Sequence, residues 1–80
     1  MANEMKLQKN TSIYSQGQPV NAIGIIQSGS IIMGSNYFSL TLDEGQVMGL
    51  FHLHNRTAVT DDIAGSDTVL SARRLQTTFP

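Results

Sequence analysis

The side chains best suited to chemistry in this chain include two histidines, His52 and His54, which are separated by one residue. On an extended strand both imidazoles point to the same side, a spacing that metal sites use. No glutamate follows them, and the next acids along the chain are Asp61 and Asp62. Two histidines in a polar loop are more often simply exposed, so the sequence favours an interpretation without a metal.

Three aspartates, Asp61, Asp62 and Asp67, raise the question of acid–base catalysis by paired carboxylates. Adjacent side chains on a strand point to opposite faces, so Asp61 and Asp62 make a poor catalytic pair. Roles in turns and as caps explain all three better. The chain has no cysteine and no set of nucleophile, base and acid, so we expect it not to be an enzyme.

Length and composition limit the remaining function classes. The chain has 80 residues, which is one domain at most, and only 14% of them are charged, which suggests that a partner or missing chain covers some apolar surface. The formal net charge is −1 and no basic stripe exists, so direct nucleic-acid binding is not expected. No segment has the length and hydrophobicity of a membrane span or a signal core, and we expect a cytoplasmic protein.

Short apolar runs separated by turns with Gly17, Gly29 and Gly45 are typical of a string of β-strands. We read these three glycines as structural. The expected strands cover residues 11–15, 22–27, 30–33, 37–42 and 46–51, with two shorter ones at 63–64 and 68–70. This spacing favours an all-β sandwich or barrel.

Residues 37–42 show the clearest alternation, which predicts that Phe38, Leu40 and Leu42 all face the core. In residues 22–27 apolar side chains fall on both faces, which predicts a strand covered on both sides. Val69, Ala72 and Leu75 are three apart, so a helical turn is the alternative to a strand there.

Three segments carry a family resemblance. Residues 7–19 contain Lys9 and Thr11 before the turn Gln16-Gly17-Gln18-Pro19, and residues 22–31 form an apolar run, a Ser28-Gly29 turn and a return strand. The third segment, residues 42–50, contains Asp43-Glu44-Gly45 and ends on Gly49-Leu50. In this order the segments resemble the opening of cyclic-nucleotide-binding domains, over roughly residues 6–51.

The resemblance implies a double-stranded β-helix, or jelly roll, of six to eight short strands in antiparallel pairs, with a site for a cyclic nucleotide or another small anion. The residues that match the family's phosphate-binding cassette are Gly49, Leu50, Arg56, Thr57 and Ala58. The family has glutamate after the glycine, whereas Leu50 cannot accept a hydrogen bond from a ribose hydroxyl. Only six residues separate Gly49 from Arg56, fewer than the family usually has.

The function implied is that of a regulatory ligand-sensing module similar to the N-terminal effector domain of bacterial transcription regulators of the catabolite-activator class. The family's domain continues into C-terminal helices, so the chain resembles a single domain, residues 1–80, that is incomplete at its C-terminus.

Two alternatives stay open. One is an interaction module without a ligand, in which the roll forms a homo-oligomer or binds a partner protein through uncovered apolar surface. The other is a metal protein of the cupin type, because cupins share this fold and hold a metal through a His-x-His motif.

Overall fold

The computed structural model describes residues 3–49 and 56–74, and within them the chain forms two antiparallel four-stranded sheets. Sheet A has the strand order β1 (Asn3–Leu7), β8 (Thr68–Arg74), β3 (Ala22–Ser28) and β6 (Val47–Met48). Sheet B has the order β2 (Ser12–Tyr14), β7 (Asp61–Ala64), β4 (Ile31–Gly34) and β5 (Ser39–Leu42).

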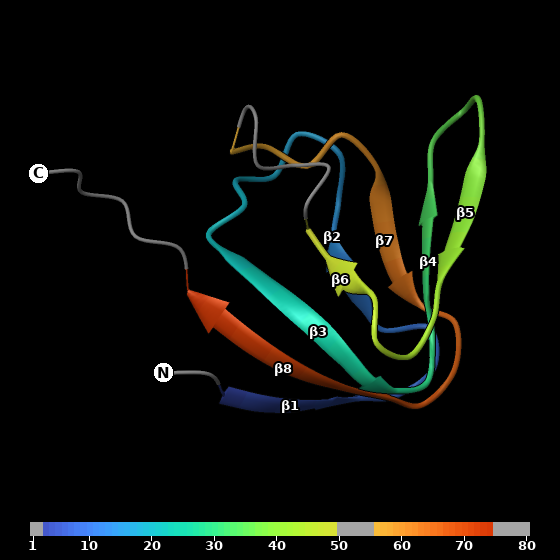
Figure 1. Ribbon diagram of the computed structural model, residues 1–80. Helices are drawn as coiled ribbons and strands as arrows, with labels where there is room; N and C mark the ends of the chain where they lie inside the picture. Colours follow the sequence, from blue (N-terminus) through green and yellow to red (C-terminus); the bar gives the residue numbers. More distant parts are fainter. Residues whose placement is uncertain (1–2, 50–55, 75–80) are drawn as a thin grey trace, which may run out of the picture.

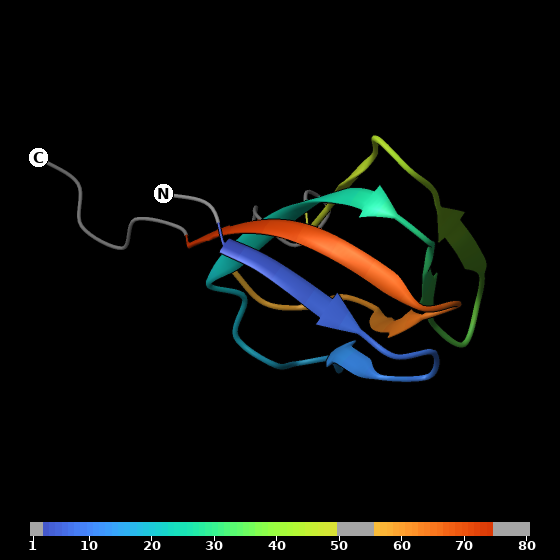
Figure 2. The same cartoon turned by 90° about the horizontal axis from the view of Figure 1, so that it is seen from below.

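The chain passes from one sheet to the other between all successive strands except β4 and β5, which form a hairpin. Figures 1 and 2 show the two sheets converging where β3 leads into β4 and β7 into β8, and diverging towards the chain termini. The prediction of an all-β roll with six to eight antiparallel strands is therefore confirmed, because the described residues contain eight.

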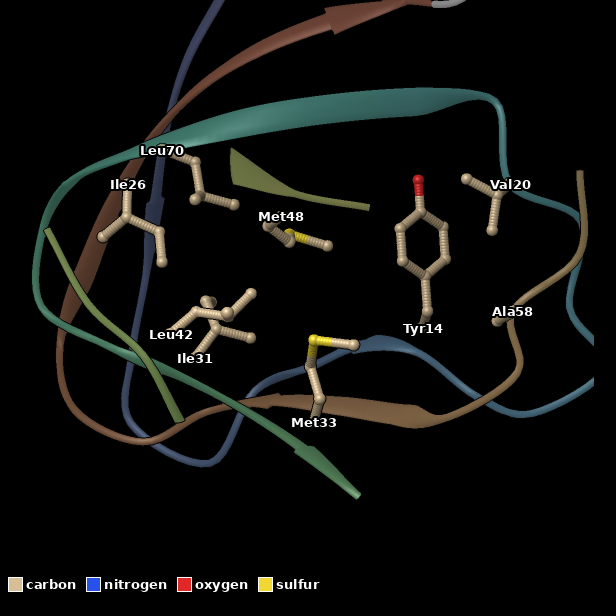
Figure 3. Close-up of a cluster of buried hydrophobic side chains, with 9 residues drawn as sticks. All are labelled: Tyr14, Val20, Ile26, Ile31, Met33, Leu42, Met48, Ala58 and Leu70. Atoms are coloured by element: carbon tan, nitrogen blue, oxygen red, sulfur yellow. The ribbon is translucent and has the colours of Figure 1, made fainter. Parts of the chain in front are cut away.

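The hydrophobic core fills the space between the sheets (Figure 3). Its buried members come from both sheets and from the connections: Tyr14, Val20, Ile26, Ile31, Met33, Leu42, Met48, Ala58 and Leu70. In β4, Ile31 and Met33 are buried while Ile32 between them is 39% exposed, as the period of a strand requires. One face of each sheet thus lines the core.

A tight corner at Gly29 joins sheet A to sheet B. Gly29 has φ +90°, and a Cβ placed there would lie 2.5 Å from the carbonyl oxygen of Asp67 and 2.5 Å from Oγ1 of Thr68. The buried Thr68 hydroxyl accepts a hydrogen bond from the Ser30 N–H and lies within donating distance of the Ser30 and Ser66 carbonyls. Thr68 therefore ties the β3–β4 corner to the β7–β8 turn.

Two predictions about burial are wrong. Phe38 lies in the hairpin connection between β4 and β5, directly before the first residue of β5. Its side chain is 53% exposed there. Of the predicted inward set only Leu42 is fully buried, whereas Leu40 is 41% exposed. The strand at β3 is covered on one face only, because Ile26 is buried while Ile25 is 46% exposed.

Two predictions about elements also need correction. Residues 68–74 form one continuous strand, so the helical turn proposed for Val69 and Ala72 is absent from that segment. The first strand, β1, was not expected, although Met5 and Leu7 alternate there with Glu4 and Lys6. The polar composition of this segment concealed the alternation.

Candidate functional site

Arg56, Thr57 and Ala58 form a short antiparallel ribbon with the loop that contains Pro19. The Val20 N–H donates to the Arg56 carbonyl at 2.9 Å, and the Ala58 N–H donates to the Gln18 carbonyl at 2.8 Å. The Gly17 N–H returns a hydrogen bond of 2.8 Å to the Ala58 carbonyl, and Thr57 forms a β-bridge with Pro19. The backbone of all three predicted site residues is therefore fixed.

Arg56 itself has an unusual backbone conformation for a non-glycine residue. Its φ is +55°, in the left-handed region, and its side chain is partly buried. This conformation is unfavourable for a residue with a Cβ and persists only where the surrounding contacts impose it. The ribbon supplies those contacts, and such positions are enriched at functional sites.

Gly49 lies directly after β6, which pairs with β3 through Gly24 opposite Met48. It is buried with φ +99°, and an added Cβ would lie 3.2 Å from Cγ2 of Ile23 and 3.3 Å from the Ala22 carbonyl oxygen. A glycine is required here both by the backbone conformation and by the close approach of β3.

Gly49 and Arg56 are the described residues on either side of residues 50–55. The predicted site residue Leu50 and the histidines His52 and His54 lie outside the described residues. Ala58 is buried in the core, so it meets solvent very little and its packing anchors the ribbon. The described part of the predicted site thus consists of Gly49, Arg56, Thr57 and the buried Ala58.

A pocket of about 320 Å³ adjoins the ribbon on the inner face of the roll. Tyr14, Met48 and Leu70 line it with other apolar groups, and Gln18 and Asn21 supply amides. Its volume lies at the lower end of the range of small-molecule sites. Because Gln18 also accepts the hydrogen bond from Ala58, the pocket wall and the ribbon share a residue.

The burial of Asp62 in the interior was not expected from the sequence. Asp62 is completely buried on β7, and the Thr60 hydroxyl donates to its Oδ1 at 2.6 Å. Asp61, by contrast, points outward and accepts a hydrogen bond from the Gln16 N–H at 2.8 Å. The two side chains face opposite ways as expected, but the role in a turn or cap is wrong for Asp62.

Tyr14 lies opposite Asp62 in the β2–β7 pair. Its hydroxyl donates to the Ala22 carbonyl at 3.0 Å and so links sheet B to the start of β3. Burial raises the pKa of Tyr14 above its ordinary value, and the nearby Asp62 carboxylate adds to this. The folded chain therefore holds the phenolic proton of Tyr14 more firmly than a solvent-exposed tyrosine would.

Within residues 3–49 and 56–74, no group of three or more histidine, cysteine or acidic side chains is arranged to hold a metal ion. No helix in those same ranges is long and apolar enough to cross a membrane.

No protein-family model matches the sequence, and no curated protein matches it either. Solved structures do match. A cyclic nucleotide-binding-like protein from Brucella abortus superposes with a TM-score of 0.74 at 20% identity, over 91% of this chain and 68% of that one. The chain has the fold of a cyclic-nucleotide-binding domain.

Other proteins with this cyclic-nucleotide-binding fold belong to larger regulators. The regulatory subunit of a cAMP-independent protein kinase A from Trypanosoma brucei matches with a TM-score of 0.82 at 18% identity, over 91% of this chain and 28% of that one. The N-terminal domain of a transcriptional regulator from Streptomyces coelicolor A3(2) matches with a TM-score of 0.77 at 12% identity, over 91% and 56%. The chain thus corresponds to about half of the transcriptional regulator's domain and to less than a third of the kinase subunit.

Proposed function

We propose that this chain is a regulatory ligand-sensing module whose effector is a small phosphate-like anion, with cyclic nucleotides as the first candidates. The observation that carries the proposal is the conformation of Arg56. A cationic residue is held in the left-handed region by a hydrogen-bonded ribbon, next to the segment that Gly49 opens. Arginine presents a planar fork of donors that matches the geometry of a phosphate.

The neighbouring groups suit the same ligand. Gly49 holds the chain close against β3 at the start of the stretch that leads to Arg56, because an added Cβ would lie 3.2 Å from Cγ2 of Ile23. Thr57 adds a hydroxyl next to the arginine, on the ribbon that holds both. A phosphate recognised in this way would be bound by one cation and a neutral hydroxyl donor.

Leu50 indicates which part of a cyclic nucleotide the site would recognise. A ribose hydroxyl needs an acceptor that leucine lacks, so the phosphate contributes most of the recognition. One protein of the same fold is described as cAMP-independent, which shows that the fold alone does not decide the effector. We therefore propose a general anion site in which ribose selectivity is weak.

Ligand binding would act on the rest of the roll through the ribbon. The ribbon joins Arg56 to the loop at residues 17–20, and the N–H of Gln16, directly before that loop, donates to Asp61 on β7. An anion that stabilises one conformation of Arg56 shifts the population of this loop by its difference in affinity for the two states. The output element belongs to a larger regulator, and we propose no catalytic activity for this chain.

Isothermal titration calorimetry with cyclic AMP, cyclic GMP and inorganic phosphate tests the site. The variant Arg56→Asn removes the guanidinium while asparagine tolerates the left-handed conformation. We expect at least about tenfold weaker binding, because a charge-assisted pair is lost. The matched control is Arg73→Asn on β8, where the arginine is exposed, and its affinity should equal that of the wild type. Unchanged affinity in Arg56→Asn, or no binding of any of the three ligands to the wild type, would refute the site.

A gain-of-function variant tests the interpretation of Leu50. Leu50→Glu introduces the missing acceptor, and we expect tighter binding of both cyclic nucleotides without tighter binding of inorganic phosphate. Weaker binding of all three anions would show that the carboxylate only repels them and that the ribose does not reach this position.

A further inference from the structure

The four edge strands of the two sheets differ in how they are protected against pairing with another chain. An edge strand exposes N–H and C=O groups that can pair with another strand, and proteins protect such edges with charges, bulges or short length. β1 carries Glu4 and Lys6, β6 has two residues, and β2 has three residues with an irregular register. β5, at the outer edge of sheet B, carries no charge and no bulge and is longer than β2 and β6.

β5 reads Ser39-Leu40-Thr41-Leu42, without charge or proline. Figure 1 shows it at the margin of the molecule with no strand of the described chain on its outer side. Exposed apolar side chains lie on this strand and in the turn before it, since Leu40 is 41% exposed, Phe38 53% and Tyr37 94%. An uncharged edge next to exposed apolar side chains is a surface that favours association.

The hydrogen bonds of the hairpin determine which peptide groups of β5 point outward. The Ser35 N–H donates to the Phe38 carbonyl at 2.9 Å, so the peptide groups of Phe38 face β4. Because the direction alternates along a strand, those of Leu40 and Leu42 face β4 as well. The N–H and C=O groups of Ser39 and Thr41 therefore point to the open edge.

We propose that β5 pairs edge to edge with β5 of a second copy of this chain, antiparallel about a twofold axis at Leu40. In this register Ser39 lies opposite Thr41 of the other copy, and the outward peptide groups of both residues meet their counterparts. Leu40 lies opposite its own copy, and Phe38 lies opposite Leu42. The two sheets B then form one continuous sheet.

A second copy fits this edge better than an unrelated chain because the register is self-complementary. One axis satisfies the outward peptide groups of both strands and places apolar residues opposite apolar residues on the inner face. Polar residues meet polar residues on the outer face, and no charge opposes its own copy. The contact is small, so the dimer is a weak one that depends on protein concentration. The pairing is independent of Arg56 and extends beyond the proposed anion site.

Cross-linking tests the register directly, since the chain has no cysteine of its own. In the variant Leu40→Cys the two introduced thiols face each other in a non-hydrogen-bonded pair, where Cα atoms are about 4.5 Å apart. That separation permits a disulfide. We expect mild oxidation to convert this variant to a covalent dimer at least about tenfold faster than Tyr37→Cys, which places a thiol at a more exposed position outside the paired strand.

A second control tests whether any cysteine on β5 would cross-link regardless of the register. In Thr41→Cys the two thiols are offset by two residues along the paired strands, about 6.6 Å. Together with the spacing between strands, this offset places the Cα atoms beyond the limit of about 7 Å for a disulfide. Equal cross-linking rates for Leu40→Cys, Tyr37→Cys and Thr41→Cys would overturn the proposal.

Sedimentation equilibrium over a range of concentrations gives an independent test that needs no cysteine. The double variant Ser39→Lys/Thr41→Lys puts like charges opposite each other, so the dimer should be lost. In Ser39→Glu/Thr41→Lys the opposed charges attract, and the dimer should be at least as stable as that of the wild type. Gln16→Lys/Gln27→Lys, at two exposed positions away from β5, should associate as the wild type does. Identical association of all four proteins, or a monomeric wild type at every concentration, would contradict the pairing.

Discussion

Tyr14 joins the two layers of the roll through a single buried hydroxyl. Figure 3 shows its side chain crossing the core from β2 towards β3, where the hydroxyl donates to the Ala22 carbonyl. The ring is only 8% exposed, and burial raises the pKa of the phenol. The folded state therefore holds the phenolic proton more tightly than the unfolded chain does.

This residue predicts how stability depends on pH in the alkaline range. Because the folded pKa of Tyr14 is raised above 10.0, its contribution is complete below about pH 10 and is lost as the pH rises through the folded pKa. Tyr14→Phe should cost about 0.5–1.5 kcal/mol at neutral pH through the lost hydrogen bond. It should then lose less stability than the wild type as the pH rises above about 10.

Urea unfolding at several pH values measures both effects, and Tyr37→Phe is the matched control because Tyr37 is 94% exposed. That control should follow the wild type throughout. A Tyr14→Phe curve parallel to that of the wild type would show that the buried phenol does not contribute to the alkaline loss.

Asp62 shows where inference from single residues fails. On β7 the buried face carries Asp62 and Ala64, whereas the opposite face carries Asp61 and Ile63, which is 38% exposed. The hydrophobic alternation gives no indication of which face is buried. The hydroxyl of Thr60, two residues earlier, donates to the buried carboxylate and helps to make its burial acceptable, and a sequence pattern does not reveal that contact.

At the scale of elements, the glycine turns have unequal importance although all have positive φ. Gly29 is enclosed by Asp67 and Thr68, whereas nothing lies within 4 Å of a Cβ built on Gly45. Gly29→Ala should therefore cost about 3–5 kcal/mol, from backbone strain together with overpacking. Gly45→Ala should cost only about 1–2 kcal/mol, from backbone strain alone.

Thermal or urea unfolding of the two alanine variants measures this difference. Gly17→Ala provides a second reference, since that position also has positive φ and open space around it. If Gly29→Ala proved no less stable than Gly45→Ala, the corner between the sheets would not have the close packing described above.

Most strands could be predicted from the sequence because their alternation and bounding glycines are local signals. The predictions for β3 and β4 agree with the structure to within one or two residues. The errors concern tertiary context. Exposure of Ile25 depends on what covers the outer face of sheet A, and the exposure of Phe38 depends on where the hairpin turns. Neither is encoded in the local period of the chain.

The candidate site was predicted from a family resemblance, and composition or periodicity alone would not have found it. The fold that the resemblance implied is confirmed, while the roles of Gly49, Leu50, Arg56, Thr57 and Ala58 stay predictions. The left-handed conformation of Arg56 could not be expected, because arginine has no preference for that region. It results from the ribbon with residues 17–20, whose partners are far apart in the sequence.

At the scale of the whole molecule, the two proposed surfaces involve different elements of the roll. The proposed anion site lies at Gly49, Arg56 and Thr57, and the proposed surface for self-association is the open edge of β5. Both proposals use residues on a rigid framework of two packed sheets, and each can fail without the other. A sensing module that binds a ligand and a second copy at different places has the parts that a regulated assembly requires.

The central claim, that the roll senses an anion at Arg56, is tested most directly by mapping the site in solution. Amide chemical shifts of the ¹⁵N-labelled protein can be followed during titration with cyclic AMP and, separately, with inorganic phosphate. We predict saturable changes that are largest at Gly49, Arg56 and Thr57 and extend across the ribbon to Gln18. Changes centred instead on the outer face of sheet A at Ile23, Ile25 and Val47, or no saturable change with either anion, would contradict the account.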